Sequence, residues 1–129
     1  MLGRRRTILV VEDDHALRAM YRFTLSAEGF HVREAVTGLE AMARIDADPP
    51  DLIVLDLGLP DIDGYSVLDE LRADPRRHAI PVVVVTGQAV LREVSVACIL
   101  RKPVTPDELV RQVLRCLAES PRANPDESR

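Results

Sequence analysis

The sequence predicts an α/β fold: one parallel sheet with helices packed on both of its faces. Short apolar runs rich in β-branched residues alternate along the chain with segments that carry helical signals. This alternation is typical of right-handed βαβ units. The run Leu52–Leu55 (LIVL) is apolar at every position, as expected of a strand covered on both faces. With 129 residues, of which 47% are hydrophobic, the chain can build one domain with a sizeable core.

The first half of the chain contains three predicted strands and two predicted helices. The strands are Thr7–Val11, residues 30–36 and Leu52–Leu55. After the first strand, Asp14 is placed to cap a helix that Gly29 ends. The face of this helix is predicted from spacings of three and four, at Leu17, Met20, Tyr21, Thr24 and Leu25. A short helix is predicted over residues 38–45, before the pair of prolines at positions 49 and 50.

The second half continues the alternation, with a helix over residues 65–72 and strands over residues 81–85 and 97–100. The last helix has the clearest start, because Thr105, Pro106 and Glu108 form an N-cap, a first-turn proline and a capping box. Its buried stripe is predicted at Leu109, Val110, Val113, Leu114 and Leu117. We expect a flexible basic leader at 1–6, one domain at 7–119 and a disordered tail at 120–129.

Composition excludes several classes of function. The net charge of -4 gives no reason to expect direct nucleic-acid binding. No apolar run reaches the ~18–20 residues needed to span a bilayer, so we expect no membrane association. Cys98 and Cys116 lie in apolar surroundings without metal-ligand spacing, and we interpret both as buried thiols of a cytoplasmic protein. Asp61 is interpreted as an ordinary loop acid.

Polar groups follow four of the predicted strands: Glu12 and Asp13, Asp56, Thr86, and Lys102. In a flavodoxin-like sheet of order 2-1-3-4-5 these four strands are neighbours, and ligands bind beyond their carboxyl ends. Three carboxylates so close together repel one another. Because Mg²⁺ prefers oxygen ligands and phosphate groups, it would relieve this repulsion. The sequence therefore predicts a Mg²⁺ and phosphate site at this edge of the sheet.

Lys102 is the one lysine of the chain, against sixteen arginines. A compact ammonium on a thin stem can pair with Asp56 and then follow a phosphoryl oxygen, a role that the larger planar head of arginine would fit poorly. The proline at position 103 redirects the chain after this residue, and a cis Lys102-Pro103 bond is compatible with that turn.

Four segments in this order resemble the receiver domain of two-component response regulators: ILVVEDD, VLDLGLPDIDG, VVVVTG and RKPVTPDEL. The resemblance covers residues 7–117. It implies that Asp56 accepts a phosphoryl group from a sensor histidine kinase or a histidine-phosphotransfer protein. It also implies that Asp13 ligates Mg²⁺ directly, that Glu12 acts through water, and that the backbone carbonyl of Gly58 is a further ligand. Thr86 and Lys102 would contact the phosphoryl group.

The same resemblance implies a signalling domain, not an enzyme with a separate substrate, which catalyses its own phosphorylation and dephosphorylation. It would stand alone and switch the binding of an unknown output protein. The chain departs from the family between Gly87 and Arg101, where fifteen residues leave room only for a shortened or irregular fourth helix. Ile99 takes the place of the usual aromatic residue. We therefore hypothesise a non-standard output surface.

Three other functions are compatible with an α/β fold of this size. A receiver-fold module for binding or homodimerisation, with a vestigial or non-standard switch, stays open. A phosphatase of the haloacid dehalogenase type needs a second acid two residues after the nucleophile, where this chain has Gly58. A dinucleotide-binding function lacks its GxGxxG motif after the first strand.

Overall fold

Five parallel strands form one sheet of order β2-β1-β3-β4-β5 in the computed structural model, which describes residues 5–87 and 98–119. The elements follow one another as β1 (Thr7–Val11), α1 (His15–Ala27), β2 (His31–Ala35), α2 (Gly38–Ala47), β3 (Leu52–Leu55), α3 (Gly64–Ala73), β4 (Val82–Thr86), β5 (Cys98–Arg101) and α4 (Pro106–Glu119). The predicted flavodoxin-like order is thereby confirmed.

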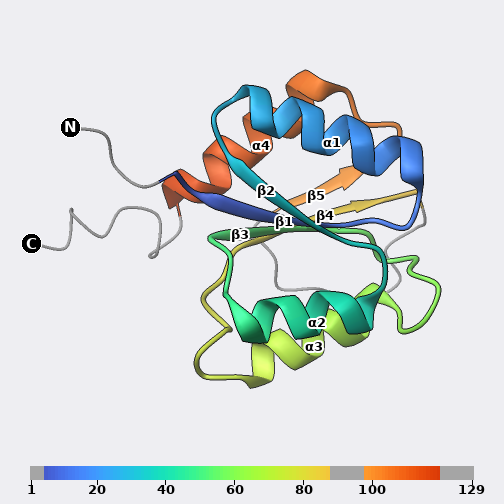
Figure 1. Ribbon diagram of the computed structural model, residues 1–129, viewed down its shortest axis with the longest axis vertical. Helices are drawn as coiled ribbons and strands as arrows, with labels where there is room; N and C mark the ends of the chain where they lie inside the picture. The colour runs from blue at the N-terminus through green and yellow to red at the C-terminus, as the bar shows by residue number, and fades with distance from the viewer. Residues whose placement is uncertain (1–4, 88–97, 120–129) are drawn as a thin grey trace, which may run out of the picture.

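The helices cover both faces of the sheet, with α1 and α4 on one side and α2 and α3 on the other (Figure 1). Successive side chains of a strand point to opposite faces. In β1, Leu9 and Val11 therefore join the core beneath α2 and α3, whereas Ile8 and Val10 join the core beneath α1 and α4. Every residue of β3 and β4 is buried, which confirms that the central strands are covered twice.

Side chains at the starts of α1 and α4 accept the backbone hydrogen bonds that the sequence predicts for them. Asp14 caps α1 by accepting from the amide of Leu17 at 2.9 Å. Thr105 and Glu108 form the predicted capping box, in which each side chain accepts the other residue's amide, at 2.9 and 3.1 Å. Gly29 has a φ of +97°, a left-handed conformation in which glycine ends a helix at no steric cost.

The prediction for the buried face of α4 was wrong at two positions, because Val110 is only partly buried and Leu114 is exposed. The buried side chains are Leu109, Val113, Cys116 and Leu117, whereas Leu114 is 48% exposed. At about 100° per residue, Leu114 lies about 140° around the helix from Leu109, beyond the stripe that faces the sheet. The burial of the Cys116 thiol is confirmed.

Several boundaries differ from the predicted ones by one to a few residues, which is the usual uncertainty at element ends. The second strand is shorter than predicted, α2 extends further, and α3 begins earlier. The predicted short fourth helix falls on residues 88–97, which lie outside the described residues, as do 1–4 and 120–129. The Lys102-Pro103 peptide bond is cis, in agreement with the sequence analysis. Within the described ranges, no helix combines the length and apolarity needed to cross a membrane.

The α4 face yields a matched test of the packing. We expect Leu109→Ala to lower the free energy of unfolding by about 2–5 kcal/mol, because it opens a cavity in the core. Leu114→Ala removes the same atoms from a half-exposed site, so it should change the free energy of unfolding by only about 0.5 kcal/mol. Urea denaturation of both variants measures the difference, and equal losses would contradict the assignment of the buried face.

Candidate functional site

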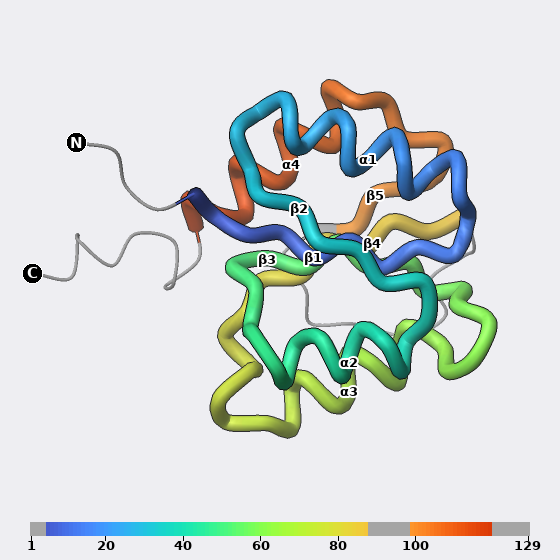
Figure 2. The backbone as a smooth tube through the Cα atoms, viewed as in Figure 1, coloured from blue at the N-terminus to red at the C-terminus, as the bar shows by residue number. Residues whose placement is uncertain are grey.

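The sheet fixes the relative positions of the residues that follow its strands. The amide of Asp56 donates to the carbonyl of Val11 at 3.0 Å, and the amide of Lys102 donates to the carbonyl of Thr86 at 3.0 Å. These bonds continue the parallel ladder one step beyond the strands. Figure 2 shows the connections that leave β1 and β3 on the same side of the molecule. The predicted site residues are therefore brought to one edge.

Three carboxylates meet at this edge: Glu12, Asp13 and Asp56 each offer an oxygen, and these oxygens all lie within 4.8 Å of one another. Glu12 is 1% exposed and Asp56 is 6% exposed, whereas Asp13 is exposed to solvent. The cluster is therefore buried on the side of Glu12 and Asp56 and open to solvent on the side of Asp13. A small cation could enter from the side of Asp13.

Lys102 is the cation of the cluster, but its preferred partner differs from the prediction. Its Nζ lies 2.9 Å from Oε1 of Glu12 and 3.7 Å from Oδ2 of Asp56. The predicted pair with Asp56 is therefore present, but Glu12 is the closer partner. Glu12 is the more deeply buried acid, and a buried charge is costly without a close partner, so the ammonium lies nearer to Glu12.

Burial and charge shift the pKa values of this pair. Burial raises the pKa of Glu12, although the hydrogen bonds from Lys102 and from the amide of Asp14 act in the opposite direction. Desolvation would lower the pKa of Lys102, but its hydrogen bond to Glu12 and the nearby carboxylates outweigh this, so its pKa is raised. Lys102 is therefore firmly cationic.

The donor set fits a hard divalent cation. With all four groups ionised, three carboxylates and one ammonium sum to a charge of -2 (-3 + 1). Every candidate ligand atom is an oxygen, as Mg²⁺ prefers, and the described residues of the cluster include no sulfur or imidazole ligand. The chemistry of the donors therefore agrees with the predicted cofactor.

Two further predicted site residues, Thr86 and Gly58, lie at or just beyond the carboxyl ends of neighbouring strands β4 and β3. Thr86 ends β4 and is completely buried. Gly58 is exposed, and its amide donates to Oδ1 of Asp56 at 3.1 Å, which fixes the orientation of that carboxylate. The loop after Asp56 is closed by a hydrogen bond from the amide of Gly64 to the carbonyl of Leu57 at 2.8 Å.

The interpretation of Asp61 as an ordinary loop acid was incomplete. Its two carboxylate oxygens accept the amides of Gly38 and Leu39, at 2.8 and 2.9 Å, so it binds the first turn of α2. Partial desolvation would raise the pKa of Asp61, but these hydrogen bonds outweigh it and hold the pKa at about 2. The partners lie more than twenty residues away in sequence, so no local motif could have revealed this contact.

Comparison with known proteins identifies the fold and its relatives. The sequence profile of the response regulator receiver domain matches residues 8–114. A 14.6 kDa protein encoded in the sodA1 3′ region of Leptolyngbya boryana is 36% identical over 90% of this chain and 94% of its own length. The structure of a CheY-like receiver domain protein from Methanospirillum hungatei superimposes with a TM-score of 0.84 at 29% identity, over 90% of this chain and 96% of that one.

A longer relative shows where such a domain occurs. The DNA-binding dual master transcriptional regulator RpaA of Synechocystis is 32% identical over 89% of this chain, which corresponds to 50% of the regulator. This chain therefore spans about half the length of that transcriptional regulator.

Two glycines near the site provide a matched steric test. A Cβ at Gly64 would lie 2.5 Å from Cα of Leu57 and 2.8 Å from the carbonyl oxygen of Asp56, both rigid backbone atoms. We expect Gly64→Ala to lower the free energy of unfolding by about 1–3 kcal/mol through overpacking. A Cβ at Gly87 would meet only Lys102, at 3.9 Å, so Gly87→Ala should be neutral or slightly stabilising.

Thermal and urea unfolding of the two variants measures this contrast. A Gly64→Ala protein as stable as the Gly87→Ala protein would show that the loop after Asp56 is looser than the structure describes.

Proposed function

This chain belongs to the response regulator receiver domain family, and we propose on that premise that Asp56 accepts a phosphoryl group in a Mg²⁺-dependent reaction. Receiver domains are signalling domains, not classical enzymes, and they bind Mg²⁺ at an acidic pocket. The observation that carries the proposal is the meeting of Glu12, Asp13 and Asp56 within 4.8 Å, with the ammonium of Lys102 beside them.

The three acids take two roles in the proposal. Asp13 and Asp56 would hold Mg²⁺ directly, and the carbonyl of Gly58 would be a further ligand. Glu12 acts through water, a role supported by its depth and by its close ion pair with Lys102. When bound, Mg²⁺ neutralises charge between the acceptor carboxylate and the phosphoryl oxygens.

The protein's own groups align the transfer. A carboxylate oxygen of Asp56 forms a bond to phosphorus as the bond between phosphorus and the donor's imidazole nitrogen breaks, and that nitrogen keeps the electron pair. The amide of Gly58 fixes the orientation of the Asp56 carboxylate by donating a hydrogen bond to Oδ1. Lys102, 3.7 Å from Oδ2, pairs with the transferred group, and the hydroxyl of Thr86 donates to it. Such transfers depend on alignment and charge neutralisation more than on covalent chemistry from the protein.

The donor in this proposal is a sensor histidine kinase or a histidine-phosphotransfer protein, since receiver domains interact with proteins of these classes. The domain comprises residues 7–119, acts in the cytoplasm and changes its affinity for an output protein when phosphorylated. Such a change requires two conformations that bind the partner unequally.

A receiver-fold module that dimerises is the second candidate. Ile99 of β5 and Leu114 of α4 are large apolar side chains that are 38% and 48% exposed, on two elements that contact each other. Exposed apolar residues on adjoining elements favour contact with another protein surface.

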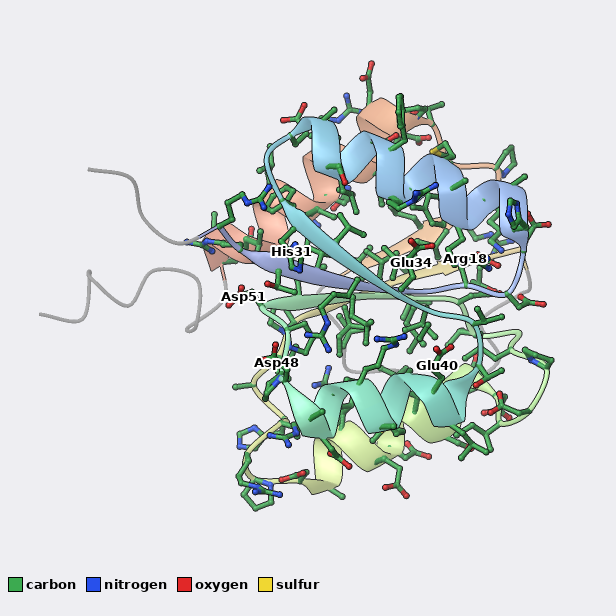
Figure 3. The ribbon with its side chains drawn as sticks, viewed as in Figure 1. Arg18, His31, Glu34, Glu40, Asp48 and Asp51 are labelled. Carbon is green, nitrogen blue, oxygen red and sulfur yellow. The ribbon has the colours of Figure 1, made fainter. Side chains whose placement is uncertain are left out.

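Intact mass after incubation with Mg²⁺ and acetyl phosphate tests the proposal. We expect one phosphoryl adduct, which is lost in Asp56→Asn and when EDTA removes Mg²⁺. Asp48→Asn changes a carboxylate at the opposite end of the sheet (Figure 3) and should keep the adduct. An adduct that persists in Asp56→Asn would place the acceptor elsewhere, and no adduct in the unmodified protein would favour the dimerisation module.

A further inference from the structure

We propose that Arg18 is a positioning residue for the divalent-cation site. Its guanidinium ties the stretch of main chain that carries Glu12 and Asp13 to Glu34 on β2. The inference rests on the proposed function, because it concerns the same Mg²⁺ site. It adds a residue that never touches the metal and acts only through the backbone of two proposed ligands.

Arg18 contacts two parts of the protein: the backbone that follows β1, and Glu34 of β2. Its Nη1 donates to the carbonyl of Glu12 at 3.0 Å and lies 3.4 Å from the carbonyl of Asp13, a longer bond. Its Nε donates to Oε1 of Glu34 at 3.1 Å. Figure 3 shows Arg18 and Glu34 side by side between α1 and β2. The side chain is only 16% exposed, so these bonds are partly shielded from water.

The segment that Arg18 binds lies between two regular elements. The last residue of β1 is Val11, and the helical ladder of α1 begins with the bond from the amide of Arg18 to the carbonyl of Asp14 at 2.9 Å. The carbonyls of Glu12 and Asp13 precede that ladder. Because backbone groups without regular partners need other donors, the guanidinium of Arg18 serves both carbonyls at once.

Glu34 holds the guanidinium in its working orientation. Its second oxygen, Oε2, pairs with Nε of Arg22 at 3.4 Å. Arg22 is 49% exposed and, among its described contacts, pairs with Glu34 and not with the β1–α1 connection. Bonds between ionised groups are stronger than neutral ones, and the planar fork of arginine fixes direction as well as charge. Glu34 thus transmits the rigidity of the sheet to the metal-binding segment.

Electrostatics alone would give Arg18 the opposite effect. A fixed positive charge beside a cation site repels Mg²⁺, so its removal should tighten binding, and salt should weaken that change. Loss of positioning should instead weaken binding, because Glu12 and Asp13 then spend less time in the ligating arrangement. The sign of the change in Mg²⁺ affinity therefore separates the two roles.

Isothermal titration with Mg²⁺ at low and moderate salt measures this sign in the full chain. We expect Arg18→Met to weaken Mg²⁺ binding about tenfold, the lower end of the losses seen when groups behind metal ligands are removed. Arg22→Met, the matched control, removes the same charge from the same carboxylate and should leave affinity unchanged or slightly tighter. Arg18→Lys should not restore binding, because one ammonium cannot reproduce the fork.

Glu34→Gln gives a second route that leaves Arg18 in place. Like Arg18→Met, it should weaken Mg²⁺ binding. In the double variant it should add little to the effect of Arg18→Met, since both changes act on the same contact between Arg18 and Glu34. Equal or tighter binding by Arg18→Met overturns the inference. Should that variant fail to fold, Glu34→Gln with the affinity of the unmodified protein overturns it instead. Absence of Mg²⁺ binding by the unmodified protein would contradict the proposed function itself, which is a distinguishable result.

Discussion

The ion pair between Lys102 and Glu12 is the interaction on which the arrangement of the site depends. A carboxylate that is 1% exposed would be costly without a cation, and Nζ of Lys102 lies 2.9 Å from it. The same ammonium remains 3.7 Å from Asp56, so one positive charge serves two acids that come from different strands. The excess negative charge left over gives the cluster its capacity for a divalent cation.

Most of the fold was predictable because its signals are local. Runs such as those of β3 and β4 are apolar at every position, and capping residues such as Asp14 and Thr105 act within three or four residues of themselves. The grouping of Glu12, Asp56 and Lys102 was also predictable, because parallel strands place their carboxyl ends at one edge of the sheet. Topology converts separate sequence positions into neighbours without any knowledge of side-chain contacts.

The features that could not be predicted depend on tertiary geometry. Asp61 binds the first amides of α2, and Arg18 bridges two carbonyls of the β1–α1 connection to Glu34 on another element. In the sequence each is one charged residue among many, and its partner is specified only once the chain has folded. Leu114 is apolar like its neighbours on α4, yet its position about 140° around the helix from Leu109 leaves it half exposed. The contacts of Asp61 and Arg18 hold the backbone around the site, although neither residue belongs to the acidic cluster.

The central claim is that one divalent cation binds among Glu12, Asp13 and Asp56. Substoichiometric Mn²⁺, added while the amide NMR spectrum is recorded, tests this claim most directly, since a paramagnetic ion broadens signals according to their distance from it. We expect the strongest broadening at the amides that follow β1 and β3, around Asp13, Asp56 and Gly58, and we expect excess Mg²⁺ to reverse it. Broadening centred on other acids, such as Asp46 and Asp48 at the opposite end of the sheet, or none at all, would contradict the claim.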